Sequence, residues 1–128
     1  MAILTRASLP KLAAIRDRNA LRAAKLQVAS YIATARAAAI RHSQPSQFYN
    51  TTTTAWATVG PDGSRSSVSG TIRLANMKVS VSPTNDSILF DPRGMASNLS
   101  GMRVYRFTRN NLTDSVCVSR LGLISRFC

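Results

Sequence analysis

The sequence has no glutamate and only five aspartates among its 128 residues. Seventeen bases, three lysines and fourteen arginines, face these five acids and give a formal net charge of +12. A surplus of this size predicts an anionic partner, which can be a nucleic acid, an anionic membrane surface or an acidic neighbouring subunit. The charge describes partners and solubility and leaves the fold open.

Long apolar runs are also missing. No stretch approaches the roughly 20 predominantly apolar residues that a membrane-spanning helix needs, and the first run without a charge ends before Arg6. The pattern of a secretory signal peptide is not visible either. Because 45% of the residues are hydrophobic, the chain is well above the level typical of disorder, and its length suits one domain with a real core. We therefore expect the chain, as it stands, to be soluble.

Groups that carry catalysis are scarce. His42 is the only histidine, and it follows a predicted helix end, where a cation suits the helix dipole. Asp62, Asp86 and Asp91 occur singly in turn-forming segments, which predicts a turn-forming role for each. No paired carboxylates, no nucleophile beside a base and no glycine-rich phosphate loop can be assembled. The sequence thus predicts a protein that is not an enzyme and that holds no metal ion or cofactor.

Residues 10–41 are predicted to form one long helix. The segment is rich in alanine, leucine, arginine and lysine, which are good helix formers, and it has no internal proline or glycine. The helix should end before Pro45, because the residue preceding a proline is pushed out of helical geometry. Six apolar residues, several of them small, recur every three or four positions on one face: Leu21, Ala24, Val28, Ile32, Ala35 and Ala39.

A narrow wedge of basic residues lies beside this apolar face, when about 100° is counted per residue. The wedge contains Lys11, Arg18, Arg22, Lys25 and Arg36. Its simplest interpretation is a solvated face. The alternative is contact with neighbouring subunits or with anionic lipid headgroups.

After Pro45 the composition changes to short runs rich in β-branched residues, separated by serine, threonine, asparagine and glycine. These runs predict antiparallel strands over residues 51–59, 67–74, 78–82, 87–90, 102–108 and 115–119. Turns are predicted at residues 60–63, 83–86 and 91–94, and the second of these should return segment 78–82 onto segment 87–90.

The predicted fold class is therefore α+β. An amphipathic spine helix covers residues 1–44, and an antiparallel β domain with a C-terminal hairpin covers residues 45–128. Phe48, Tyr49 and Trp56 are interpreted as core or sheet-face residues in preference to stacking platforms for nucleic-acid bases.

The last twelve residues predict a hairpin with Gly122-Leu123 as a two-residue loop, because glycine at the first loop position is what a type II′ turn requires. This register places Cys117 directly opposite Cys128. We therefore predict a disulfide, worth roughly 3 kcal/mol in the chain-entropy model, and an oxidising compartment outside the cytoplasm. Two unrelated buried thiols are the alternative.

Three segments together carry a family resemblance. They are the alanine- and arginine-rich helix of residues 9–41, the segment of residues 88–94 and the segment of residues 116–122. In this order and spacing they resemble the spine helix, the strand-then-glycine segment and the terminal strand and turn of type IV pilin-like proteins. The similarity is to the GspH/FimT group, which contains minor pilins of type IV pili and minor pseudopilins of type II secretion.

The sequence departs from the family pattern at both ends. The family begins with a basic leader, a processing site and an apolar stretch containing a glutamate, whereas residues 2–10 resemble only the tail of that stretch. This difference predicts a shortened fragment or a start assigned too late, with the membrane segment missing. The terminal turn has Gly122-Leu123 where the family often has Gly-Arg, which weakens any transfer of a ligand-binding role to that turn.

The resemblance implies a structural subunit that packs into, primes or caps a type IV pilus or a type II secretion pseudopilus. The apolar helix face from Leu21 to Ala39 is then the predicted filament-packing surface. The implied partners are other pilin or pseudopilin subunits, and the implied location is the bacterial inner membrane and periplasm. Without the apolar segment, the chain is expected to be monomeric.

The alternative function is a DNA-binding receptor that works within such a filament, since some minor pilins of this group are implicated in DNA capture for uptake. A third hypothesis is a free nucleic-acid-binding protein unrelated to pili. The phosphate-binding patch of a receptor would come from arginines in or near the C-terminal strands, whose simpler interpretation is a solubilising surface. These candidates are Arg103, Arg106, Arg109, Arg120 and Arg126.

Overall fold

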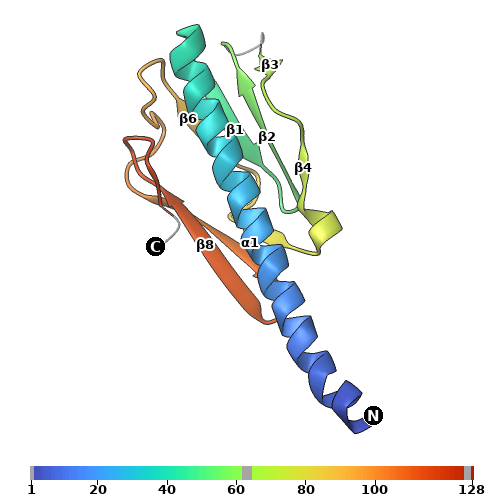
Figure 1. Cartoon of the computed structure of the whole chain (residues 1–128). Helices are drawn as coiled ribbons and strands as arrows, with labels where there is room; N and C mark the ends of the chain where they lie inside the picture. Colours follow the sequence, from blue (N-terminus) through green and yellow to red (C-terminus); the bar gives the residue numbers. More distant parts are fainter. Residues whose placement is uncertain (1, 62–64, 126–127) are drawn as a thin grey trace.

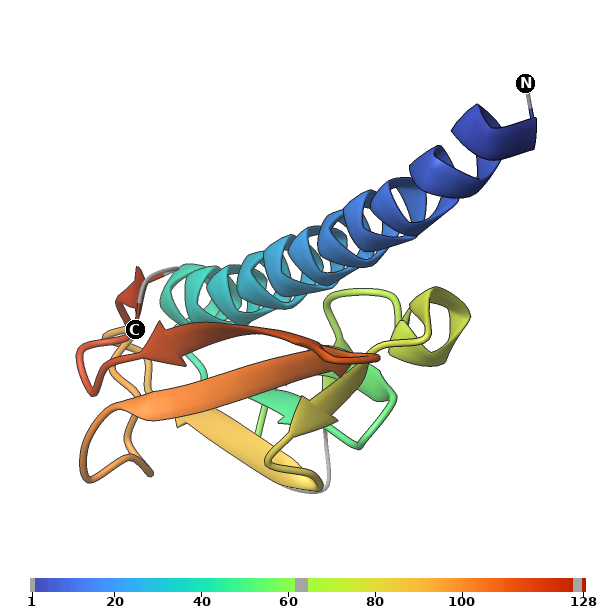
Figure 2. The ribbon, with the colours of Figure 1, turned by 90° about the horizontal axis from the view of Figure 1, so that it is seen from below.

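The computed structural model describes residues 2–61, 65–125 and 128. One long helix, α1 (Ala2–His42), is followed by strands that form two antiparallel sheets (Figure 1). The helix lies along one face of the strands, and its N-terminal end extends past them (Figures 1 and 2). The α+β fold predicted from the sequence, a spine helix followed by antiparallel strands, is confirmed.

The helix begins earlier than predicted and ends where expected. It includes Ala2 and passes through Pro10, which was predicted to start it. A proline inside a helix removes one hydrogen bond, but the alanine- and leucine-rich residues on both sides favour the helix enough to continue it. The helix ends at His42, and Ser43 takes a φ of 52°, so the turn into the strands precedes Pro45. In the part of the chain that the structure describes, no helix combines the length and the apolarity needed to cross a bilayer.

The first sheet has the order β3-β2-β1-β6, and β4 also pairs with β2. Its strands are β1 (Ser46–Asn50), β2 (Thr54–Val59), β3 (Ser66–Ser67), β4 (Ile72–Arg73) and β6 (Asp86–Phe90). The sequence did not predict β1 as a strand. The single strand predicted over residues 67–74 was wrong, because only β3 and β4 form there and the 3-10 helix η1 (Leu74–Met77) follows. Between them the Ser69 hydroxyl accepts a hydrogen bond from the Ala57 N–H at 3.0 Å, in place of a carbonyl in a regular ladder.

The second sheet has the order β5-β7-β8-β9. Its strands are β5 (Ser80–Ser82), β7 (Arg103–Arg109), β8 (Leu112–Val118) and β9 (Ile124–Ser125). The predicted return of segment 78–82 onto segment 87–90 was wrong, since β5 pairs with β7 and β6 pairs with β1. A turn signal fixes the position of a reversal, whereas the choice of partner strand depends on burial: Val81 pairs with Phe107, and Ile88 pairs with Phe48.

One hydrophobic core joins the helix to both sheets. Phe48 of the first sheet packs edge-on against Tyr105 of the second, with ring centroids 5.8 Å apart. On the opposite face of the first sheet, Tyr49 and Trp56 form a half-buried cross-strand pair with centroids 4.8 Å apart. The interpretation of Phe48, Tyr49 and Trp56 as core or sheet-face residues is confirmed.

Candidate interaction surfaces

The apolar helix face predicted to pack against other subunits lies inside the chain's own core. All six of its side chains are buried, with exposed fractions of 0–4%. The helical periodicity was therefore interpreted correctly, but its assignment as the filament-packing surface was wrong. Strands that follow the helix in the same chain bury this face before any partner can reach it. The buried residues are Leu21, Ala24, Val28, Ile32, Ala35 and Ala39.

A second stripe of small and apolar residues lies roughly opposite the first and faces outward. It consists of Leu26, Ala33, Ala37 and Ile40, all exposed, within an arc of about 60° when about 100° is counted per residue. No strand covers this face in either view (Figures 1 and 2). Because the two alanines project little, another helix could approach the backbone of α1 closely here. We call these four residues the outward stripe.

The outward stripe continues sideways onto the C-terminal loop. A groove of about 220 Å³ runs between α1 and the loop, lined on the helix side by Ala33, Ala37 and Ile40 and on the loop side by Leu123 and Ile124. Leu121, in the same loop, is also exposed. Helix and loop thus form one shared apolar surface.

Arg36 fastens this loop region to the helix. Its Nε donates a hydrogen bond of 2.9 Å to the Gly94 carbonyl. Gly94 has a φ of 86° and Gly122 a φ of 82°, conformations that favour glycine. A Cβ on Gly122 would lie 2.3 Å from the Gly94 carbonyl oxygen and 2.7 Å from the Arg36 Nε. Because neither glycine has a Cβ, the loop of Gly94, the loop of Gly122 and the side chain of Arg36 can pack directly against one another.

The predicted disulfide is present, but the predicted hairpin register was wrong. Cys117 and Cys128 are bonded, with their Cα atoms 6.0 Å apart. In the ladder, however, Cys117 pairs with Ser125, so the register is shifted by three residues from the predicted one. The Gly122 N–H donates to the Ser119 carbonyl at 3.0 Å, and the positive φ of Gly122 places it third in a three-residue loop. Gly122 was correctly predicted to lie in the turn, but the predicted loop length and its position in that loop were wrong.

The basic wedge on the helix divides into two groups. Lys25 is buried and forms an ion pair of 3.0 Å with Asp114 of β8, and Arg36 bonds to Gly94. These two residues fasten α1 to its own β domain, so their side chains are not available to bind partners. Lys11, Arg18 and Arg22 remain exposed. The interpretation of the wedge as one solvated or partner-binding face was therefore wrong for two of its five members.

A second ion pair, which the sequence did not reveal, holds the lower part of the helix. The Asp17 carboxylate accepts hydrogen bonds from the Arg109 Nε at 2.7 Å and from the Asn110 Nδ2 at 3.1 Å. These two hydrogen bonds hold the pKa of Asp17 below its ordinary value. The Arg109 guanidinium also donates to the Met77 carbonyl. Asp17 is thus the point where the turn between β7 and β8 is tied to α1.

Of the four candidate DNA-binding arginines that the structure describes, two are engaged in ion pairs within the chain. Arg103 is paired with Asp86 and Arg109 with Asp17, so both charges are engaged within the chain. Arg106 is exposed on the opposite face of β7, because side chains alternate along a strand. Arg120 is exposed in the loop before β9. The fifth candidate, Arg126, lies outside the described residues.

The aspartates predicted to form turns have different roles. The carboxylate of Asp91 accepts hydrogen bonds from the Met95 and Arg93 N–H groups, and the first of these is the main cause that lowers its pKa. This turn-forming role is confirmed. Asp86 instead lies in β6, where it accepts from Arg103 and from the buried Tyr105 hydroxyl, so its prediction was wrong. Asp62 lies outside the described residues.

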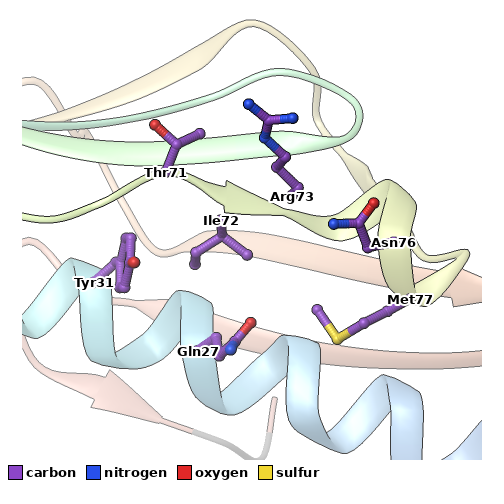
Figure 3. Close-up of a pocket in the computed structure, with 7 residues that line it drawn as sticks. All are labelled: Gln27, Tyr31, Thr71, Ile72, Arg73, Asn76 and Met77. Atoms are coloured by element: carbon purple, nitrogen blue, oxygen red, sulfur yellow. The ribbon is translucent and has the colours of Figure 1, made fainter.

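A shallow pocket of about 360 Å³ opens between α1 and the segment from β4 to η1 (Figure 3). Ile72 and Met77 point toward the helix, whereas Arg73 points away from it (Figure 3). Gln27 and Tyr31 complete the helix side. Apart from Arg73 the lining is amide, hydroxyl and apolar, without a nucleophile beside a base or a group of ligating side chains, so this pocket offers no catalytic chemistry of its own.

Comparison with known proteins agrees with this architecture. The family model described as "Type II transport protein GspH" matches residues 26–122, which is well over half of the chain. No curated protein matches the sequence.

Two crystal structures of the type IV minor pilin FimU of Pseudomonas aeruginosa are similar in fold. The crystal in space group P21 superposes with a TM-score of 0.71 at 14% identity, covering 89% of this chain and 92% of FimU. The crystal in space group P65 gives 0.66 at 13% identity, covering 82% and 90%. At this identity the likeness describes the fold alone.

Proposed function

The chain belongs to the GspH family of minor pilins and pseudopilins, and we propose that it is a structural subunit that packs into, or primes, a type IV pilus or a type II secretion pseudopilus. Membership of this family makes it a structural protein and not an enzyme. Its partners in this role are other pilin or pseudopilin subunits. The disulfide between Cys117 and Cys128 supports a location in an oxidising compartment such as the periplasm.

The observation that carries this proposal is the outward stripe. A helix that has already buried one apolar face against its own strands has no internal need for a second one. Leu26 and Ile40 nevertheless remain 41% and 49% exposed, with Ala33 and Ala37 between them. Such a face gains stability when a neighbouring helix covers it, and the small residues allow a close approach.

The loop beside the stripe is held rigidly enough to belong to the same contact surface. The disulfide fastens the C-terminus to β8, and the Arg36–Gly94 hydrogen bond fastens the neighbouring loop to α1. Leu123 is therefore presented in a fixed position next to the helix, which reduces the conformational entropy lost on association.

Site-specific photo-cross-linking in cells that assemble the filament tests the proposal. A photoreactive phenylalanine analogue at Ala37 should form cross-links to another pilin-like subunit, because this position lies in the centre of the proposed contact. The matched control is the same analogue at Ser82, which is exposed on β5, the edge strand of the second sheet. Cross-links of equal yield from both positions, or from Ser82 alone, would contradict packing through the outward stripe.

An assembly assay gives independent evidence. Ala33→Arg places a long cation in the stripe at an exposed position, so the free energy of unfolding should change by no more than about 0.5 kcal/mol. Incorporation into the filament should fall strongly. Normal incorporation of this variant would rule out the stripe as the contact surface.

The DNA-receptor alternative rests on less of the molecule than the sequence indicated. Of its five arginines, Arg106 and Arg120 form no ion pair with another described residue, and they lie on β7 and on the C-terminal loop. Among the residues that the structure describes, the arginines of the β domain do not form one phosphate-binding surface. The DNA-receptor hypothesis therefore remains a prediction from the sequence.

A further inference from the structure

The lower part of α1 carries a surface that filament packing through the outward stripe does not use. Below Leu21, the first helix residue in the core, the side chains of Lys11, Arg16 and Arg18 are exposed. Arg22, one turn above Arg18, is exposed as well. The N-terminal end of the helix extends past the strands in both views (Figures 1 and 2), whereas Arg18 and Arg22 still border the β7–β8 hairpin.

The only acid in this part of the helix, Asp17, lies next to Arg16 but bonds mainly to the β domain. Asp17 is engaged by Arg109 and Asn110 from the β domain, on the side of the helix that faces the strands. None of the ion pairs among the described residues involves Lys11, Arg16, Arg18 or Arg22. Four cations against one aspartate that is engaged by the β domain leave the segment with a net positive surface.

Two apolar side chains lie between these cations. Leu12 is 55% exposed and Ile15 is 53% exposed, and neither belongs to the hydrophobic core. Counting about 100° per residue, Lys11, Arg18 and Arg22 fall on one side of this pair and Arg16 on the other. The surface is thus an apolar centre flanked by cations on both sides. On one of these sides Arg18 and Arg22 also border β8, where they line a small pocket with Leu112, Thr113 and Asp114. We call the four cations and the two apolar residues the basic collar.

This arrangement matches the chemistry of an anionic lipid surface. Lysine and arginine next to a bilayer extend their charged ends to the headgroups while apolar neighbours enter the interface. Nucleic acid is less well matched, because the collar has no aromatic side chain for stacking on bases and because exposed leucine and isoleucine gain nothing from phosphate. We propose that the basic collar binds the surface of a membrane that contains anionic phospholipids, with Leu12 and Ile15 entering the interface.

The proposal is independent of filament packing. The outward stripe, Leu26 to Ile40, lies farther along the helix beside the β domain, so one subunit could use both surfaces. Failure of membrane binding would leave the filament proposal in place, and failure of cross-linking at Ala37 would leave the collar in place.

Co-sedimentation of the full 128-residue chain with vesicles tests the collar. Vesicles of phosphatidylcholine with 30% phosphatidylglycerol (a chosen test composition of roughly one anionic lipid in three) should bind the chain, and pure phosphatidylcholine should bind it far less. Lys11→Gln with Arg16→Gln should weaken binding by about fivefold per charge removed, hence roughly 25-fold. Arg106→Gln with Arg120→Gln removes the same charge from the β domain and should have a much smaller effect.

Two further arms separate a membrane surface from a general polyanion. Leu12→Asn with Ile15→Asn should weaken vesicle binding several-fold and leave binding to duplex DNA unchanged, since only the bilayer offers an apolar interface. All these positions are exposed, and circular dichroism should confirm that the variants fold. Equal losses from the two charge-removing pairs, no effect of the Leu12 and Ile15 changes, or tighter binding to DNA than to vesicles at equal phosphate concentration would each overturn the proposal.

Discussion

Asp17 in the lower part of α1 and Arg109 at the end of β7 are joined by a hydrogen bond of 2.7 Å, although 92 positions separate them in the sequence. Their side chains retain only 16% and 12% of their exposure. The Lys25–Asp114 ion pair lies about two turns farther along the helix. The two contacts together fix the β7–β8 hairpin along the helix. The hairpin is therefore attached at two charged points as well as through the apolar core.

The Asp17 contact predicts a pH-dependent contribution to stability. The folded-state pKa of Asp17 lies below its ordinary value of 3.8, so the folded protein binds the proton less readily than the unfolded chain. The stabilisation is thus complete above about pH 5 and is lost as the pH falls through the folded-state pKa. Asp17→Asn should lower the free energy of unfolding at pH 7, and its difference from the unmodified chain should shrink below about pH 4. Urea denaturation at several pH values measures this.

A double-mutant cycle provides the control. Arg109→Gln removes the partner, so Asp17→Asn should cost less in that background than in the unmodified chain. Additive effects at pH 7, or a difference for Asp17→Asn that stays constant down to pH 3, would show that the carboxylate acts through something other than this pair.

The meeting point of Gly94, Gly122 and Arg36 predicts an unusually large effect for a small substitution. Gly122→Ala combines a positive φ with a Cβ 2.3 Å from the Gly94 carbonyl oxygen, so it should destabilise the chain by roughly 2 kcal/mol or more. Gly101→Ala is the matched control, because nothing lies within 4 Å of its Cβ. The control should be neutral or slightly stabilising. Equal thermal shifts for the two variants would mean that the contact at Gly122 relaxes freely.

The disulfide predicts both a thiol count and a stability difference. Denatured, unreduced protein prepared under oxidising conditions should show no free thiol, since Cys117 and Cys128 are bonded. Cys117→Ala with Cys128→Ser should lower the free energy of unfolding by about 3 kcal/mol, which is the chain-entropy value for a short loop. Guanidinium denaturation compares the two proteins. Two titratable thiols, or unchanged stability, would contradict a structural role for the bond.

Local patterns were enough to predict several elements. The 3.6-residue period placed Leu21, Val28 and Ile32 on one buried face, and the proline rule placed the helix end near residue 42. The glycine in the Asp91–Gly94 turn and the pairing of the two cysteines followed from equally local signals. Each of these features depends on residues that are close in the sequence or on a single covalent bond.

The failures share a different cause, which is competition between distant partners. Periodicity shows that a helix face is apolar but not whether the same chain or another one covers it, and here the strands cover it. An arginine in a strand looks available until Asp17 or Asp86, far away in the sequence, is placed beside it. With only five acids in the chain, scarcity was a usable signal: each carboxylate among so many bases can be expected to have a partner.

Ala33 and Ala35 lie on different faces of the helix, so the same substitution should have a small effect at the first and a large effect at the second. Ala35 is completely buried, so Ala35→Leu should overpack the core and cost about 1–3 kcal/mol. Ala33 is exposed, so Ala33→Leu should change the free energy of unfolding by less than about 0.5 kcal/mol. Thermal denaturation of the two variants measures the contrast. If both substitutions were neutral, the apolar helix face that contains Ala35 could not be packed in the core of the chain.

The last prediction concerns duplex DNA. At +12 the chain should bind DNA weakly and without sequence preference, by displacing counterions from phosphates. Affinity alone is therefore uninformative, and the informative quantity is where the binding occurs. Arg18 and Arg22 are exposed one turn apart on the helix, whereas Arg106 and Arg120 are separated on the β domain.

Neighbouring cations can contact phosphates together, so Arg18→Ala with Arg22→Ala should weaken binding more than Arg106→Ala with Arg120→Ala. The first pair should also reduce the slope of log affinity against log salt by roughly 2, and the second by less than 1. Fluorescence anisotropy over a range of salt concentrations measures both quantities. Each pair removes the same charge, so equal losses would indicate diffuse attraction by net charge. A larger loss from the β-domain pair would instead restore the DNA-receptor hypothesis, because those arginines stay accessible when a neighbouring subunit covers the helix.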